Sequence, residues 1–166
     1  MKLNGFIYKL PVEFKRLILA FVVVLNLGFV TGLMFVGETS SANPKGIQEQ
    51  YLGNEDQEDV EVMKFKKSER EMLTLIHNHV LSMSLIFFLL GGLLGICELK
   101  IKWKLFLMIE PFISIILTFG GLYCLWKGIL WMQYVVIFSG FLMATVFFIS
   151  SGIIVIQSLK KENGIN

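Results

Sequence analysis

Four long apolar stretches dominate this chain of 166 residues and limit what it can fold into. As a helix rising about 1.5 Å per residue, each stretch is long enough to cross about 30 Å of hydrocarbon. A soluble core cannot hide so much apolar surface, because roughly a third of the surface of a small unfolded chain still meets water after folding. The sequence therefore predicts an all-α integral membrane protein with four transmembrane helices in an antiparallel bundle. The apolar stretches are Leu17–Gly37, Val80–Cys97, Leu105–Trp126 and Ile129–Ile156.

The first apolar stretch is well beyond the 7–15 residues typical of the core of a cleaved signal peptide. Only Ser40-Ser41-Ala42 resembles a cleavage site, and weakly. We therefore expect the stretch to remain in the protein as the first span.

The distribution of basic residues predicts the orientation of the spans. Lysine and arginine gather before the first span, between the second and third, and after the fourth, whereas the long segment between the first two spans is mainly acidic. Because cytoplasmic loops carry the excess of basic residues, both termini are expected in the cytoplasm. The basic residues on that side are Lys2, Lys9, Lys15, Arg16, Lys100, Lys102, Lys104, Lys160 and Lys161.

These patterns divide the chain into nine segments along the sequence. The expected spans are residues 17–37, 73–97, 105–126 and 130–157. The expected cytoplasmic parts are an interfacial segment at 1–16, a loop at 98–104 and a tail at 158–166. The expected extracytoplasmic parts are a long segment at 38–72, which includes the start of the second long helix, and a turn at 127–129.

The extracytoplasmic segment begins with turn-forming residues, "ETSSANPKG", and continues with an acidic and then a basic run. The acidic run, Asn54–Glu61, lacks the spacing and the central glycine of a calcium loop. We interpret the two runs as a solvated loop whose halves attract each other weakly. Ser68 and Glu71 then form the pattern of a capping box, which predicts a helix from about Glu69 to about Cys97.

Small residues line one face of several spans. Gly91 and Gly95 are four residues apart in the second span, and Gly28 and Gly32 have the same spacing in the first. Such pairs let helices approach closely in lipid, so these faces are expected to pack. His77 falls on the Gly91 face and is expected to look inward, toward the other helices.

Glu110 lies inside the third span, directly before Pro111. An ionisable side chain at this depth is costly and suggests a function such as proton handling or a subunit contact. The alternative is a carboxyl group that is protonated or pairs with Lys102 or Lys104. Asn26 in the first span is expected to bond to a neighbouring helix.

The two histidines, His77 and His79, are expected at the extracytoplasmic interface, level with Tyr123 and Trp126. Tyrosine and tryptophan are common at membrane interfaces, so an aromatic belt is the simpler interpretation. Helix positions i and i+2 point about 200° apart, so both imidazoles cannot bind one ion, and no metal is expected. His79 and Met83 would suit copper(I) but are only two ligands. A haem would need a second ligand from elsewhere, and a quinone could bond to the histidine and tyrosine at this depth.

The segments "GIQEQYLG", "MKFKKSEREML", "HNH" and "EPFISIILTFGG" resemble a group of small four-span bacterial inner-membrane proteins without established activity. The resemblance covers most of the chain from Asn43 on. It implies the same fold and topology, with the extracytoplasmic loop paired to the helix that carries His77 and His79. It implies no reaction.

The sequence thus favours a non-enzymatic protein of the bacterial inner membrane, an accessory or structural subunit that works through protein contacts. No catalytic motif is present, no cofactor is expected, and the basic residues follow the membrane, which excludes nucleic acid. The expected partners are the lipid bilayer and either a membrane protein or further copies of the chain. One alternative is a haem, copper or quinone protein using His77, His79, Tyr123 and Trp126. Another is a small proton-coupled transporter or channel using Glu110.

Overall fold

The computed structural model describes residues 3–41, 43–55 and 62–160, and within these ranges all regular structure is helical. Four helices are long and apolar enough to cross a membrane, which confirms the predicted fold class. The elements are η1 (Phe6–Lys9), α1 (Val12–Ser40), α2 (Pro44–Leu52), α3 (Glu69–Ile96), α4 (Ile101–Trp126) and α5 (Met132–Leu159).

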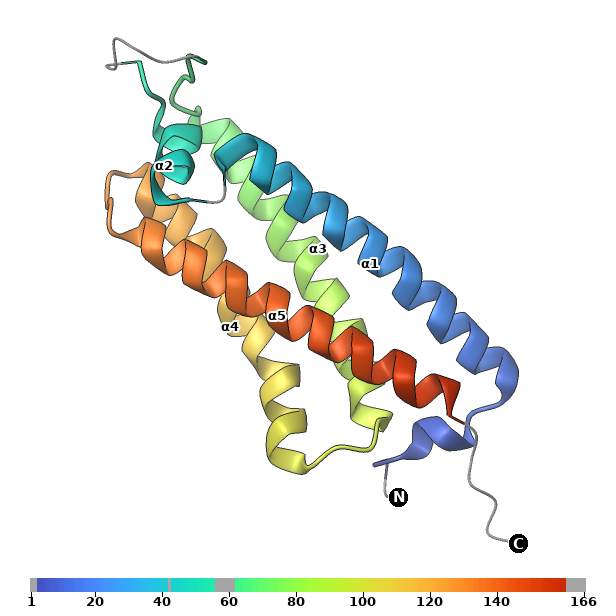
Figure 1. Cartoon of the computed structure of the whole chain (residues 1–166). Coiled ribbons are helices and arrows are strands. Elements are labelled where there is room, and N and C mark those ends of the chain that lie inside the picture. The colour runs from blue at the N-terminus through green and yellow to red at the C-terminus, as the bar shows by residue number, and fades with distance from the viewer. Residues whose placement is uncertain (1–2, 42, 56–61, 161–166) are drawn as a thin grey trace, which may run out of the picture.

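The four long helices run alongside one another, and the short helix α2 sits at one end of the bundle (Figure 1). The short helix η1 and the end of α5 lie at the opposite end (Figure 1). We call these two ends the α2 side and the termini side. The positive-inside expectation places the termini side in the cytoplasm.

Helix α3 begins where the capping box predicted. The Ser68 hydroxyl accepts a hydrogen bond from the Glu71 amide at 3.3 Å, and the Ser68 amide donates to the Glu71 carboxylate at 2.7 Å. These bonds satisfy amide groups that the first turn of a helix leaves without partners. Cys97 ends the helix and turns the chain toward α4.

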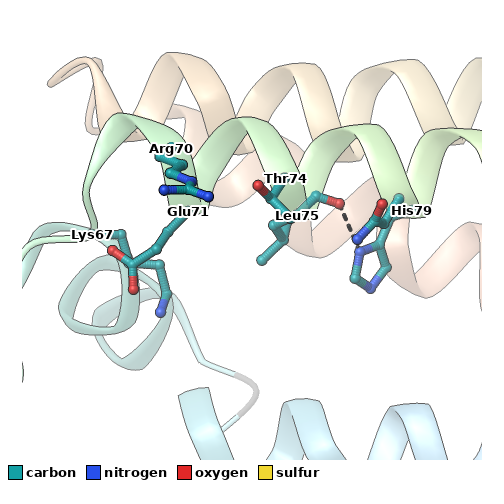
Figure 2. A pocket seen from close by; sticks show the side chains of 7 residues that line it. Lys67, Arg70, Glu71, Thr74, Leu75 and His79 are labelled. Carbon is teal, nitrogen blue, oxygen red and sulfur yellow. Dashed lines mark hydrogen bonds between the residues drawn. The ribbon is translucent and has the colours of Figure 1, made fainter.

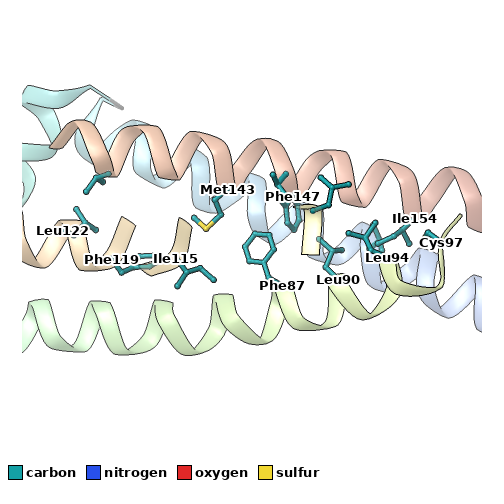
Figure 3. Packing of buried hydrophobic residues seen from close by; sticks show 14 of the residues in the cluster. Phe87, Leu90, Leu94, Cys97, Ile115, Phe119, Leu122, Met143, Phe147 and Ile154 are labelled. Atoms are coloured by element: carbon teal, nitrogen blue, oxygen red, sulfur yellow. The ribbon is translucent and has the colours of Figure 1, made fainter. Parts of the chain in front are cut away.

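The core is built mainly from α3, α4 and α5 (Figure 3). Phe147 of α5 is fully buried and meets Phe87 of α3 edge to face, with ring centroids 6.1 Å apart. Phe29 of α1 stacks on the other side of Phe147 at 3.9 Å. Half of the apolar window of α4 is buried (50%), against 11% for α1. The central helix is therefore α4, and α1 is peripheral.

Helix α1 leaves the bundle in its second half. Ile18 and Val22 are buried, and Phe29, on the same face, is half-buried. Leu33 and Val36 continue toward the α2 side near that face, yet they are 41% and 46% exposed. The inward side of α1 therefore lies open between Phe29 and the end of the helix.

Helix α2 falls where the sequence suggested turns, and α1 also runs further than expected, to Ser40. The Asn43 side chain caps α2 by accepting a hydrogen bond from the Gly46 amide at 2.8 Å. A Cβ atom at Gly46 would collide with the carbonyl oxygen of Ser40, so only glycine allows the two helices to approach this closely.

The end of α2 is fixed to the segment that leads into α3. The buried side chain of Asn54 donates to the Val62 carbonyl at 3.0 Å and accepts from the Lys64 amide at 2.7 Å. The Lys64 ammonium reaches back to the Thr39 carbonyl at 2.7 Å. Most of the acidic run, residues 56–61, lies outside the described residues.

On the termini side, the N-terminal segment folds under the bundle. The Asn4 side-chain oxygen accepts hydrogen bonds from the Leu99 amide at 3.1 Å and from the Lys104 ammonium at 2.7 Å. Ile7 in η1 is buried. The segment expected at the membrane interface therefore also holds the α3–α4 connection in place.

Candidate functional site

The two histidines point in different directions, but not as expected. His77 is exposed, so the expectation that it looks inward is wrong. The ring of His79 lies 5.1 Å from that of Phe119 on α4, and its Nδ1 is 2.9 Å from the Leu75 carbonyl oxygen. The better placed histidine is therefore His79, although it too remains exposed.

Tyr123 and Trp126 belong to a separate aromatic cluster at the end of α4. Their rings lie 5.7 Å apart, and the Lys127 ammonium lies 4.5 Å from the Trp126 ring centroid. The Trp126 indole donates a hydrogen bond to the Lys67 carbonyl at 2.7 Å, and Lys127 pairs with Glu69 at 3.7 Å. Trp126 is only 7% exposed. This cluster anchors the segment before α3 to α4.

A pocket of about 420 Å³ lies along the first turns of α3. Its lining residues form two rows at helical spacing, so they share one side of the helix. Figure 2 shows Glu71, Leu75 and His79 extending from α3, and Lys67 from the segment just before it, toward the side on which α1 runs. The lining residues are Lys67, Arg70, Glu71, Thr74, Leu75, Asn78 and His79.

The pocket carries basic groups at the α2 side, Leu75 is its apolar lining residue, and His79 marks its inner end. Of the four expected site residues, only His79 lines this pocket; His77, Tyr123 and Trp126 do not.

Glu110 is 7% exposed and lies inside α4, about 14 Å from the start of that helix. One carboxylate oxygen accepts a hydrogen bond from the Ser114 hydroxyl. The other, Oε2, is buried without a partner among the described residues. The alternative, a pairing with Lys102 or Lys104, is not formed among the described residues, where Lys104 donates to Asn4, Gly95 and Cys97 and Lys102 is exposed.

Further polar groups follow Glu110 along the contact between α4 and α5. The hydroxyl groups of Thr118 and Ser139 lie 2.7 Å apart and fix the register of the two antiparallel helices. In this register Ser150 falls within about one helical turn of the Glu110 level. Its hydroxyl is also buried without a partner among the described residues. A buried polar group without a partner normally calls for water, an ion or a functional role.

Asn26 does not bond to another helix. Its side-chain amide donates to the Val22 carbonyl of α1 itself at 2.7 Å. Within the described ranges, no group of three or more histidine, cysteine, aspartate or glutamate side chains could hold a metal ion.

Comparison with known proteins supports the membrane assignment. A family model described as a transmembrane helical domain matches residues 41–165. The chain belongs to this family. No curated protein and no solved structure matches the chain.

The family match begins one residue after α1 ends at Ser40. Helices α2 to α5 therefore lie within the part of the chain that matches the family, and so do His79, Glu110 and the pocket. The quoted segments of the earlier resemblance, from Gly46 onward, also lie within it. Helix α1, which is peripheral in the structure, lies outside the matched residues.

Sequence reasoning missed α2 and the pocket that forms beside it. The signal for α2 was present, since Asn43 and Pro44 suit the first positions of a helix and Gly53 suits its end. The pocket had no comparable signal. From the sequence, Lys67 and Arg70 belong to a basic run that is expected to be solvated, and nothing in that run indicates a pocket.

Proposed function

We propose that this protein is a non-enzymatic accessory or structural subunit of the bacterial cytoplasmic membrane, which acts by binding another membrane protein or further copies of itself. The observation that carries the proposal is an unoccupied glycine face on α1. A Cβ atom at Gly28 or at Gly32 would meet no atom of the described chain within 4 Å.

Small residues in membrane helices normally serve close contacts. Helices in lipid gain little from hydrophobic association and depend on packing, which small residues improve because backbones can approach. Gly28 and Gly32 lie one turn apart. Beside them, the Thr31 hydroxyl donates a hydrogen bond to the Gly28 carbonyl at 2.9 Å. This face therefore suits a helix that the single chain does not supply.

The position of α1 supports the same proposal. Its main contact with another long helix is with α5, and it lies outside the residues that match the family. The matched helices form the common core, and α1 is the element best placed to select a partner.

The double variant Gly28→Leu/Gly32→Leu tests this proposal. We expect it to release the partner, because two leucines would hold the backbones apart, and to lower the mass of the complex in native electrophoresis after mild detergent extraction. Gly92→Leu on α3 is the matched control, since Gly92 is also exposed with nothing within 4 Å of a Cβ. A wild-type protein that runs as a partner-free monomer at native expression would count against the proposal.

Glu110 supports a second candidate function, proton-coupled transport or channel activity. A carboxyl group near the middle of a membrane helix, with one oxygen unpartnered among the described residues, suits the binding and release of a proton. The hydroxyl groups of Ser114, Thr118 and Ser139 extend this polar line toward the α2 side.

The variant Glu110→Gln tests the second candidate. Vesicles containing the purified protein and a trapped pH indicator should lose a proton gradient faster than empty vesicles, and the variant should abolish the difference. Ser82→Ala on the exposed side of α3 is a control that removes a hydroxyl outside the polar line. Equal proton leak in wild type and Glu110→Gln would eliminate this function.

A further inference from the structure

We propose that the pocket on α3 binds one anionic phospholipid from the leaflet on the α2 side. Its phosphate lies between Lys67 and Arg70, and an acyl chain follows Leu75 into the open space beside the second half of α1. This proposal is independent of the protein contacts and of the proton function proposed above.

The charge at the rim of the pocket favours an anion. Lys67 and Arg70 form no ion pair within the described residues, where the pairs are Lys45–Glu49 and Lys127–Glu69. Basic side chains at a membrane surface attract anionic lipids, and arginine can bind a phosphate through two hydrogen bonds.

Glu71 does not cancel this charge for a ligand. Its Oε2 atom accepts hydrogen bonds from both the amide and the hydroxyl of Ser68, each at 2.7 Å. The carboxylate is therefore directed at the start of α3 and serves as the helix cap. The rim carries a net positive charge, because Lys67 and Arg70 have no ion-pair partners in the described chain and Glu71 is the one carboxylate that lines the pocket beside them.

The inner end of the pocket presents a ring nitrogen of His79. The Leu75 carbonyl can only accept, so the Nδ1 atom of His79, 2.9 Å away, must carry the proton. The other ring nitrogen, Nε2, has no partner among the described residues and is available to a polar group of the lipid.

The remaining surface suits a hydrocarbon chain. His79 lies nine positions after Arg70, so the pocket extends about 14 Å along α3 into the membrane. Leu75 is the apolar lining residue on this path, and Leu33 and Val36 of α1 are exposed. A basic rim above a slot lined by Leu75 and uncharged polar side chains suits a phospholipid at the membrane surface, and the volume of about 420 Å³ is in the range of small-molecule sites.

The test compares lipid binding to delipidated protein in dodecyl maltoside by native mass spectrometry. The probes are phosphatidylglycerol and phosphatidylcholine with the same acyl chains. We expect one phosphatidylglycerol per chain in preference to phosphatidylcholine. The variant Lys67→Gln/Arg70→Gln should weaken binding roughly 10- to 30-fold, the effect of two basic residues near a membrane surface.

Two further variants separate the site from general charge effects. Lys100→Gln/Lys102→Gln removes the same charge from exposed positions on the termini side and should leave binding unchanged. Leu75→Trp keeps the charges but fills the slot, and should weaken binding. Circular dichroism of every variant checks that the helices remain intact.

Several results would overturn the proposal. Equal binding of the two lipids, or wild-type binding by Lys67→Gln/Arg70→Gln, would show that no anionic headgroup is recognised. An equal loss in Lys100→Gln/Lys102→Gln would show a general charge effect. Displacement of phosphatidylglycerol by equimolar inorganic phosphate would assign the pocket to soluble anions, and a quinone retained there in place of lipid would assign it to a redox ligand.

Discussion

Single atoms decide how closely α1 and α2 approach. Because a Cβ at Gly46 would collide with the rigid backbone of Ser40, we expect Gly46→Ala to destabilise the protein by about 1–3 kcal/mol, the usual range for overpacking. Alanine is otherwise the better helix former by about 1 kcal/mol, so a net loss would identify the collision. Thermal unfolding in detergent measures it, with Gly92→Ala as the control at an open glycine. A more stable Gly46→Ala protein would contradict the packing.

Residue-level prediction from the sequence was correct for the cap at Ser68 and wrong for His77. Of the two glycine pairs expected to pack, only Gly91 lies beside another helix, where it is buried next to Met108. The expectation is wrong for the others, because a Cβ at Gly28, Gly32 or Gly95 would meet no neighbour within 4 Å. Gly91 lies toward one edge of the face that Phe87 and Leu90 define as buried. A small residue does not by itself mark the centre of the packed face. The sequence therefore could not show that His79, and not His77, turns toward α4.

At the scale of elements, the capping box sets the start of α3 and so the position of the proposed lipid site. Ser68→Ala removes an acceptor for the Glu71 amide and a donor to its carboxylate, and we expect a loss of about 1 kcal/mol. Amide hydrogen exchange should speed up in the first turn of α3, with no change at its opposite end. Ser82→Ala is the control on the same helix, and equal exchange in the first turn of wild type and Ser68→Ala would contradict this role.

Element boundaries were predictable where local chemistry is strong. The end of α4 at Trp126 and the start of α3 followed from composition and capping. The short helix α2 was not expected, because nine residues carry no long apolar period and its position depends on contacts with α4 and α5. Boundaries set by distant contacts are not visible in a single sequence.

At the scale of the whole molecule, four spans place α2 and the two termini on opposite sides of the membrane. We expect Lys45→Cys to react with a membrane-impermeant maleimide added outside intact cells, and Lys100→Cys to react only after the membrane is opened. Both side chains are exposed, so accessibility depends on the side of the membrane alone. The reverse pattern would contradict the orientation predicted from the basic residues.

The number of spans was predictable because hydrocarbon thickness fixes the length of an apolar helix. The separation of α1 from its neighbours was not, because its sequence is as apolar as theirs. A helix face that meets lipid and a helix face that is buried in protein are both rich in apolar residues. Only the packed structure distinguishes the peripheral helix from the central one, and with it reveals the pocket.

The partners of α1 also have a consequence for synthesis. Among the described helices, α1 is synthesised before α5, yet α5 provides its main contact with another long helix, through pairs such as Phe29 and Phe147. Until α5 has entered the bilayer, α1 lacks this contact and remains mainly among lipids. Although α1 is synthesised before α3, α4 and α5, it is therefore among the last of these helices to reach its final position.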